Sequence, residues 1–253
     1  MEINSYSTWL EIDLNAITQN VAYIKRMTGV EVMAVIKANG YGHGARPAAQ
    51  AAVQGGATWC GVARIEEALA LRRAGISAEL MVLGYTPPSK IPEAIDQQIV
   101  VSLFDPSQAE TCLNYARING GKLRAHVKVE TGMGRLGMLP EEVIPFLRAL
   151  QGSAIQVEGI FTHFARADEP ESGYTQRQIE IFNQLLAELE QEGLKPPMVH
   201  AANSAAVFNF PQAWYNMVRP GNAIFGMSPS PAMHLDPALK PALTWKARLI
   251  SVR

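Results

Sequence analysis

The sequence predicts an α/β fold, a (β/α)8 TIM-like barrel. Short apolar runs that suit buried parallel strands alternate with runs that suit helices, and eight strand-like runs can be counted from Val32 onward. The 253 residues are enough for eight such units. The composition, 48% hydrophobic and 18% charged, is typical of one large buried core. A doubly wound open sheet is the alternative fold.

The predicted elements follow one another in the order that a barrel requires. A helix with Ile17, Val21 and Ile24 on one face precedes the first strand, which runs from Val32 to Ile36. The other strands are predicted at 59–63, 79–84, 99–103, 123–130, 157–164, 198–202 and 217–225. Helices are predicted at 65–74, 107–119, near 141–150 and near 175–192. Parallel strands need such crossover helices.

Two segments do not fit into the barrel. Residues 8–14 alternate in polarity with period two, and residues 243–253 also resemble a strand. An apolar sheet edge without a partner is an aggregation hazard, so we expect both to belong to a β domain that this chain largely lacks. The predicted organisation is a strand of that domain at 1–14, the barrel at 15–235, and the start of a truncated C-terminal β domain at 236–253.

Composition and charge exclude several classes of function. The formal net charge of −1 speaks against a nucleic-acid partner. No apolar stretch approaches the roughly 18 residues of a membrane span, and Met1 to Ser5 lack a secretion signal, so a cytoplasmic location is expected. Cys60 and Cys112 lack the spacing of metal ligands and are expected in the core, and no metal site is predicted.

Lys37 is the first candidate functional residue. It follows an apolar strand, and the C-terminal ends of parallel strands are where ligands bind. A lysine at such a place is ordinarily a solvated side chain whose stem covers apolar surface. The glycines that follow allow close backbone approach, and Tyr41 adds a hydroxyl group. This arrangement suits a Schiff-base lysine near a phosphate.

A second candidate region begins at the strand 123–130. Strict alternation places Arg124, His126, Lys128 and Glu130 on one face, which is either a functional polar face inside the barrel or the outer face of an edge strand. Arg135 follows on a glycine-rich loop at the C-terminal end of the same strand, from which it can reach a ligand.

The last strands supply the remaining candidates. His163 lies late in an apolar strand, where a core histidine is the ordinary interpretation. Backbone N–H groups and the hydroxyl of Ser204 could bind an anion at the next strand-to-helix turn, as phosphate sites in barrels often do. Gly221 and Asn222 could add backbone donors, and Arg219 would point to whatever the phosphate anchors.

Taken together, four segments resemble the alanine racemase family, and the resemblance spans nearly the whole chain. They are Ala34 to Gly44 (AVIKANGYGHG), Thr131 to Gly137 (TGMGRLG), His200 to Ser204 (HAANS) and Arg219 to Gly221 (RPG). The resemblance implies an N-terminal barrel, a C-terminal β domain and pyridoxal 5′-phosphate as cofactor.

The resemblance also implies roles for individual residues. Lys37 would bind the cofactor covalently and act as the catalytic base on one face of the substrate Cα. The phosphate would be held by Tyr41, Ser204 and the backbone of Gly221 and Asn222. Arg135 would contact substrate and the phenolic oxygen of the cofactor, and Lys128 occupies the place of a lysine that is often carbamylated. His163 and Asn203 would support the surroundings of the ring, and Arg219 would face the pyridine nitrogen.

The implied reaction is the racemisation of L-alanine and D-alanine, which supplies D-alanine for peptidoglycan, in a homodimer. The second base of the family comes from the partner subunit's C-terminal domain, so this chain by itself is expected to be weak or inactive. The alternatives are a barrel that binds pyridoxal phosphate without catalysis, a phosphate-binding barrel enzyme without cofactor, and a related decarboxylase. For the decarboxylase, an acidic residue would be expected in place of Arg219.

Overall fold

The computed structural model describes residues 6–231, 233–234 and 236–251. Met1 to Ser5, which were searched for a secretion signal, lie outside the described residues. So do Val252 and Arg253, at the end of the last predicted strand. Among the described residues, no helix combines the length and the apolar character that crossing a membrane demands.

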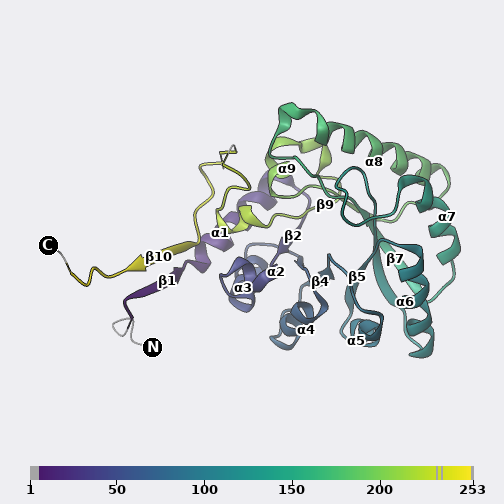
Figure 1. Ribbon diagram of the computed structural model, residues 1–253, viewed down its shortest axis with the longest axis horizontal. Coiled ribbons are helices and arrows are strands. Elements are labelled where there is room, and N and C mark those ends of the chain that lie inside the picture. Colours follow the sequence, from purple (N-terminus) through teal and green to yellow (C-terminus); the bar gives the residue numbers. More distant parts are fainter. Residues whose placement is uncertain (1–5, 232, 235, 252–253) are drawn as a thin grey trace.

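Within these residues, eight parallel strands close into a barrel in the order of the chain, as predicted (Figure 1). The first strand pairs with the last, with Val32 opposite Val218, so the open sheet is excluded. The strands are β2 (Glu31–Val35), β3 (Trp59–Val62), β4 (Glu79–Val82), β5 (Ile99–Leu103), β6 (Leu123–Lys128), β7 (Ile155–Phe161), β8 (Met198–His200) and β9 (Met217–Val218).

Helices surround this barrel. Asp13 begins α1 by accepting a hydrogen bond from the Ala16 N–H at 3.0 Å, and Gly29 ends it with a φ of 69°. The helices are α1 (Leu14–Thr28), α2 (Lys37–Tyr41), α3 (Ala45–Gln54), α4 (Ile65–Arg73), α5 (Ile91–Asp96), α6 (Pro106–Ile118), α7 (Pro140–Leu150), α8 (Tyr174–Gln191) and α9 (Ser204–Asn209). Short 3₁₀ turns are η2 (Pro88–Lys90), η3 (Pro170–Ser172), η4 (Pro211–Ala213) and η5 (Asn222–Phe225).

The core has two parts, because side chains alternate between the two faces of each strand. Val32 and Ala34 of β2 belong to the large cluster between strands and helices, whereas Met33 between them belongs to a separate cluster. That smaller cluster, inside the barrel, consists of Met33, Trp59, Met81, Val100, Phe161 and Met217. The inside of the barrel is therefore filled, and a ligand can bind only at its ends.

The prediction of a strand over 217–225 is wrong beyond Val218. Pro220 has no N–H to donate to a neighbouring strand, and Gly221 leaves the extended conformation with φ −109° and ψ −84°. The chain then forms η5. The strand predicted over 123–130 likewise ends at Lys128, since Glu130 turns into the following loop.

The described residues of the two terminal segments pair with each other and with no strand of the barrel. Strand β1 (Thr8–Ile12) lies antiparallel to β10 (Leu243–Ala247), with Leu10 opposite Trp245. In Figure 1 this ribbon projects away from the barrel, with the start of β1 and the end of β10 farthest from it. The predicted strand 243–253 is thus too long, because β10 ends at Ala247.

Candidate active site at the mouth of the barrel

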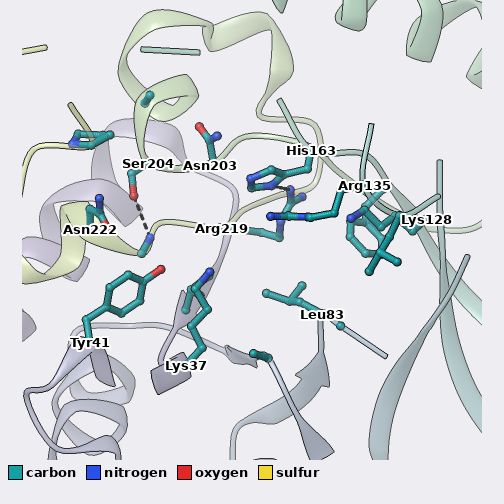
Figure 2. A pocket seen from close by; sticks show the side chains of 18 of the residues that line it. Lys37, Tyr41, Leu83, Lys128, Arg135, His163, Asn203, Ser204, Arg219 and Asn222 are labelled. Carbon is teal, nitrogen blue, oxygen red and sulfur yellow. Dashed lines mark hydrogen bonds between the residues drawn. The ribbon is translucent and has the colours of Figure 1, made fainter. Parts of the chain in front are cut away.

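A cavity of about 390 Å³ opens at the C-terminal ends of the barrel strands (Figure 2). The ten residues to which the family resemblance gave a role line it, whereas Arg124, His126 and Glu130 of the second candidate region do not. Its volume is in the range of small-ligand pockets. The predicted residues that it brings together are Lys37, Tyr41, Lys128, Arg135, His163, Asn203, Ser204, Arg219, Gly221 and Asn222. Residues from the ends of five different strands, β2, β6, β7, β8 and β9, therefore form one site.

A left-handed turn holds Lys37 and Tyr41 against this cavity. Residues 38–41 in α2 have φ values of 53°, 54°, 62° and 52° in succession. A left-handed conformation costs about 1–2 kcal/mol for each residue other than glycine, so Ala38, Asn39 and Tyr41 store strain. The Lys37 amine lies 5.8 Å from the centre of the Tyr41 ring, and Figure 2 shows both groups pointing into the pocket.

The carboxylate of Glu67 holds the start of this turn. One of its oxygens accepts a hydrogen bond from the Ala38 N–H at 2.7 Å. The other accepts from the N–H groups of Ala63 at 2.8 Å and Arg64 at 3.1 Å. Glu67 thereby joins the residue after Lys37 to the loop after β3, a contact that no motif in the sequence indicated.

Replacing Glu67 by glutamine should lower the free energy of unfolding by about 1–2 kcal/mol, because the amide retains one acceptor oxygen where the carboxylate offers two. Urea denaturation measures the difference. The matched control is Glu66→Gln, which makes the same chemical change at the exposed neighbouring position. Equal stability of the two variants would contradict a role of Glu67 in holding the turn.

Ser204, Gly221 and Tyr41 meet on another side of the pocket. The Ser204 Oγ accepts hydrogen bonds from the N–H groups of Gly221 at 2.9 Å and Ala223 at 3.2 Å. A Cβ atom on Gly221 would lie 2.5 Å from the Tyr41 hydroxyl oxygen, so this position requires glycine. The Ser204 hydroxyl accepts from these two N–H groups and keeps its own proton to donate, so together with the Tyr41 hydroxyl it suits an anion such as phosphate.

Asn203 lies next to Ser204, and both the oxygen and the nitrogen of its side-chain amide are hydrogen-bonded. Its side-chain oxygen accepts from the Ala206 N–H at 3.0 Å and begins α9. Its side-chain N–H₂ donates to the Phe164 carbonyl at 3.3 Å. The part of the chain from Asn203 to Ser204 is therefore held rigidly at the edge of the cavity.

Lys128 and Arg135 form a cationic wall. Lys128 is 3% exposed, and burial, together with Arg135 and Arg219, lowers the pKa of its amine to about 8. No ion pair of Lys128 is formed in the described part of the chain. Glu130 instead accepts from the N–H groups of Gly134 at 2.8 Å and Arg135 at 3.3 Å, which holds the arginine loop.

Arg219 is 4% exposed and is bound by neutral acceptors. Its Nη2 donates to the carbonyls of Thr162 at 2.8 Å and Ala201 at 2.9 Å, and its Nη1 donates to His200 Nδ1 at 2.9 Å. The Nη2 also lies 3.3 Å from Nδ1 of His163. Burial lowers the pKa of Arg219 to about 9, so the guanidinium is still charged at neutral pH.

The structure adds residues that sequence reasoning gave no role. His200 was part of a matched motif, and His126 lay on the polar face of its predicted strand, yet their contact with one another could not be read from the chain. Asp168 is the one acidic residue among those that line this cavity. Against it stand four basic residues, Lys37, Lys128, Arg135 and Arg219, so the pocket is suited to an anionic ligand.

Comparisons with known proteins give one consistent result. The family model described as "Alanine racemase, N-terminal domain" matches residues 12–229. The alanine racemase of Symbiobacterium thermophilum is 46% identical over 244 residues, which are 96% of this chain and 65% of that protein. The alanine racemase of Desulforamulus reducens is 42% identical over 252 residues, covering 97% and 68% of the two chains.

Solved structures agree. The alanine racemase from Bacillus anthracis with bound L-Ala-P has a TM-score of 0.88 at 39% identity, covering 94% of this chain and 63% of that one. The alanine racemase of Clostridium difficile in complex with cycloserine has a TM-score of 0.90 at 33% identity, covering 96% and 68%. This chain therefore spans about two thirds of the length of the relatives that it matches.

Proposed function

Since this chain belongs to the alanine racemase family, we propose that its pocket binds pyridoxal 5′-phosphate and takes part in the interconversion of L-alanine and D-alanine. The observation that supports this most is the convergence of three features in one cavity. They are an amine at a strand end, a hydroxyl-lined corner with backbone N–H groups, and a buried arginine.

The residues present fit this cofactor. Tyr41, Ser204 and the backbone around Gly221 would hold its phosphate, and the space that Gly221 leaves next to the Tyr41 hydroxyl is needed there. The excess of basic over acidic residues matches the negative charge of the phosphate. Lys37 is exposed at the open mouth of the pocket, where an aldehyde can reach its amine.

When bound, pyridoxal phosphate withdraws electrons from the substrate Cα and so makes its proton acidic. Lys37 would then take and return that proton on one face of the Cα. Arg219 donates hydrogen bonds and cannot accept them, so a ring nitrogen held beside it would stay unprotonated and would withdraw electrons less strongly. Arg219 would therefore favour prompt return of the proton to the Cα, which is racemisation, over transamination.

The supporting residues would act on the ring and the substrate. Arg135 would contact the phenolic oxygen and the substrate, and Asn203 and His163 would restrict the space around the ring. An acidic residue at position 219 would fit the alternative decarboxylase, and an arginine stands there. We therefore favour the racemase over the decarboxylase.

We further propose that Lys128 is carbamylated. The neutral amine adds to carbon dioxide and releases one proton, and the resulting negative charge would hold the Arg135 guanidinium. Because the pKa of Lys128 is lowered to about 8, a substantial fraction of its amine is neutral in mildly alkaline solution.

The Lys128 carbamate should appear in ¹³C NMR spectra of the protein in ¹³C-bicarbonate, and its signal should grow between pH 7 and 9, since only the neutral amine reacts. The variant Lys128→Met is the control and should lack the signal. Lys90, which is paired with Glu93 at the surface, should remain unmodified. A signal that persists in the Lys128→Met variant would refute the assignment.

We propose that the complete activity requires a β domain and a partner subunit in addition to the barrel. We propose that the β1–β10 ribbon joins a β domain, which is supported by Leu10 and Trp245, opposite each other and 52% and 75% exposed. In a homodimer, that domain of the partner subunit would supply the base on the other face of the Cα. This chain by itself would then convert alanine slowly or not at all.

We also propose a cytoplasmic location, where the D-alanine formed would enter peptidoglycan synthesis. Cys60 and Cys112 are both buried as free thiols, which is usual in reducing compartments.

Reductive trapping tests the proposed function. Incubation with pyridoxal phosphate followed by borohydride should attach a phosphopyridoxyl group to the peptide that contains Lys37, as measured by mass spectrometry. The variant Lys37→Arg keeps the positive charge and should lose the label. Label distributed over many lysines, or unchanged in Lys37→Arg, would favour the phosphate-binding barrel without cofactor.

A further inference from the structure

Two buried histidines lie behind Arg219 in a continuous chain of hydrogen bonds. The Arg219 Nη1 lies 2.9 Å from Nδ1 of His200, and the Nε2 of His200 lies 2.8 Å from Nδ1 of His126. Both imidazoles are completely buried. His126 does not line the pocket, so it can act on a bound ligand only through the other two residues.

Arg219 determines which group donates and which accepts in each of these hydrogen bonds. A guanidinium has only donors, so His200 Nδ1 must accept, and a neutral His200 then carries its proton on Nε2. That proton is donated to His126 Nδ1, which leaves the proton of a neutral His126 on its own Nε2. Burial and the charge of Arg219 keep the pKa of both imidazoles low, so both are neutral at pH 7.

We propose that His126 is a positioning residue for Arg219. By accepting the Nε2 proton of His200, His126 leaves Nδ1 of His200 free to receive and orient the guanidinium. This inference rests on the proposed function only in assigning Arg219 to the cofactor ring.

The backbone of β6 and β7 around His126 leaves room for its imidazole ring next to His200. A Cβ atom at Gly159 of the neighbouring strand would lie 2.6 Å from His126 Nδ1, so only glycine leaves room for the imidazole. The pairing of β6 with β7 shifts its register between Ala125 and His126. On the other side, Phe161 stacks on His200 with 4.8 Å between ring centres and an interplanar angle of 4°, which fixes that ring.

The contacts of His126 are not those expected of a side chain that only fills space in the core. Its Nε2 is buried and has no hydrogen-bond partner among the described residues, which is a cost that an apolar side chain would avoid. The polar atom that does make a contact is Nδ1, and that contact is with His200.

Loss of this acceptor has a defined consequence. Without it, His200 can carry its proton on Nδ1, and two donors then face each other at 2.9 Å. The guanidinium must turn away from His200, and it remains held by the carbonyls of Thr162 and Ala201.

The test compares His126→Asn with His126→Leu. The side-chain oxygen of asparagine can stand near the place of Nδ1 and accept the His200 proton, whereas leucine has a similar size and no acceptor. Asparagine buries a polar amide where leucine buries methyl groups, so the stability of each variant is measured separately and the state of His200 and Arg219 decides the test. Any difference between them at His200 and Arg219 therefore reports the hydrogen bond.

Solution ¹⁵N NMR of the chain without cofactor provides the measurement. In the wild type and in His126→Asn, His200 should be protonated at Nε2 alone, and the Arg219 Nη protons should give separate signals. In His126→Leu, the Nδ1 tautomer of His200 should appear and rotation of the Arg219 guanidinium should become faster by about tenfold.

Two results would overturn the proposal. One is a wild-type His200 protonated at Nδ1, which can be measured even if a variant does not fold. The other is identical spectra of His200 and Arg219 in the two variants. Because no cofactor is used, failure of labelling at Lys37 would refute the proposed function and leave this test unaffected.

Discussion

Lowering the pH from 7 to 5 should reduce the free energy of unfolding by about 4 kcal/mol through His126 and His200. The folded-state pKa of His126 is lowered to about 3, and that of His200 is well below its ordinary value, in both cases chiefly by burial. The unfolded chain binds protons near pH 6.5 and the folded chain does not. This stabilisation is therefore complete above pH 6.5 and is lost as the pH falls below it.

Urea denaturation at pH 7, 6 and 5 measures this dependence. In His126→Asn the slope of stability against pH should fall by the share of one histidine. His200 and His163 remain, and burial also lowers the pKa of His163 well below its ordinary value. The comparison stays above the pH at which most carboxylates titrate. Equal slopes in the two proteins would show that His126 takes up a proton without unfolding.

The second large effect is expected at Gly226, which ends η5. The variant Gly226→Ala should lower the free energy of unfolding by about 3 kcal/mol or more. A Cβ atom there would lie 2.1 Å from the carbonyl oxygen of Lys240, a backbone atom that cannot move without its segment. That segment is held against the barrel by Asn20, whose amide donates to the Lys240 carbonyl at 2.8 Å and accepts from the Lys240 N–H at 2.8 Å.

The control variant Gly193→Ala separates the steric clash expected at position 226 from the strain of a left-handed backbone. Gly193 has a φ of +64°, close to the +66° of Gly226, but a Cβ atom there would meet nothing within 4 Å. It should cost about 1 kcal/mol, the strain of a left-handed alanine. Equal losses in the two variants, measured by urea denaturation, would show that the Lys240 segment yields freely.

The membership of the candidate site was predictable because of the geometry of parallel strands. Lys37, Lys128 and Ser204 are far apart in the sequence, but each lies near the C-terminal end of a predicted strand or in the turn that follows it. In a closed parallel barrel all such strand ends meet at one rim. Knowing the fold class was therefore sufficient to place these side chains around one cavity.

The conformation of the site was not predictable in the same way. Glycine at 40 and 42 indicated an unusual turn, but Ala38, Asn39 and Tyr41 also take left-handed angles that their own preferences oppose. The Glu67 carboxylate that holds the turn comes from another part of the chain. Similarly, the predicted strand 217–225 is interrupted at Pro220, although its apolar residues suit a strand.

The sequence by itself determined the order of the barrel strands and the residues at their C-terminal ends, because periodicity and strand ends are local properties of a chain. Only the tertiary structure decided that the barrel closes by pairing β2 with β9, and which donor meets which acceptor. It joined Arg219 to His200 and His126, bound Glu67 to the turn after Lys37, and paired β1 with β10 across the length of the chain. These contacts depend on distances between segments remote in sequence, and such distances exist only once the barrel has closed.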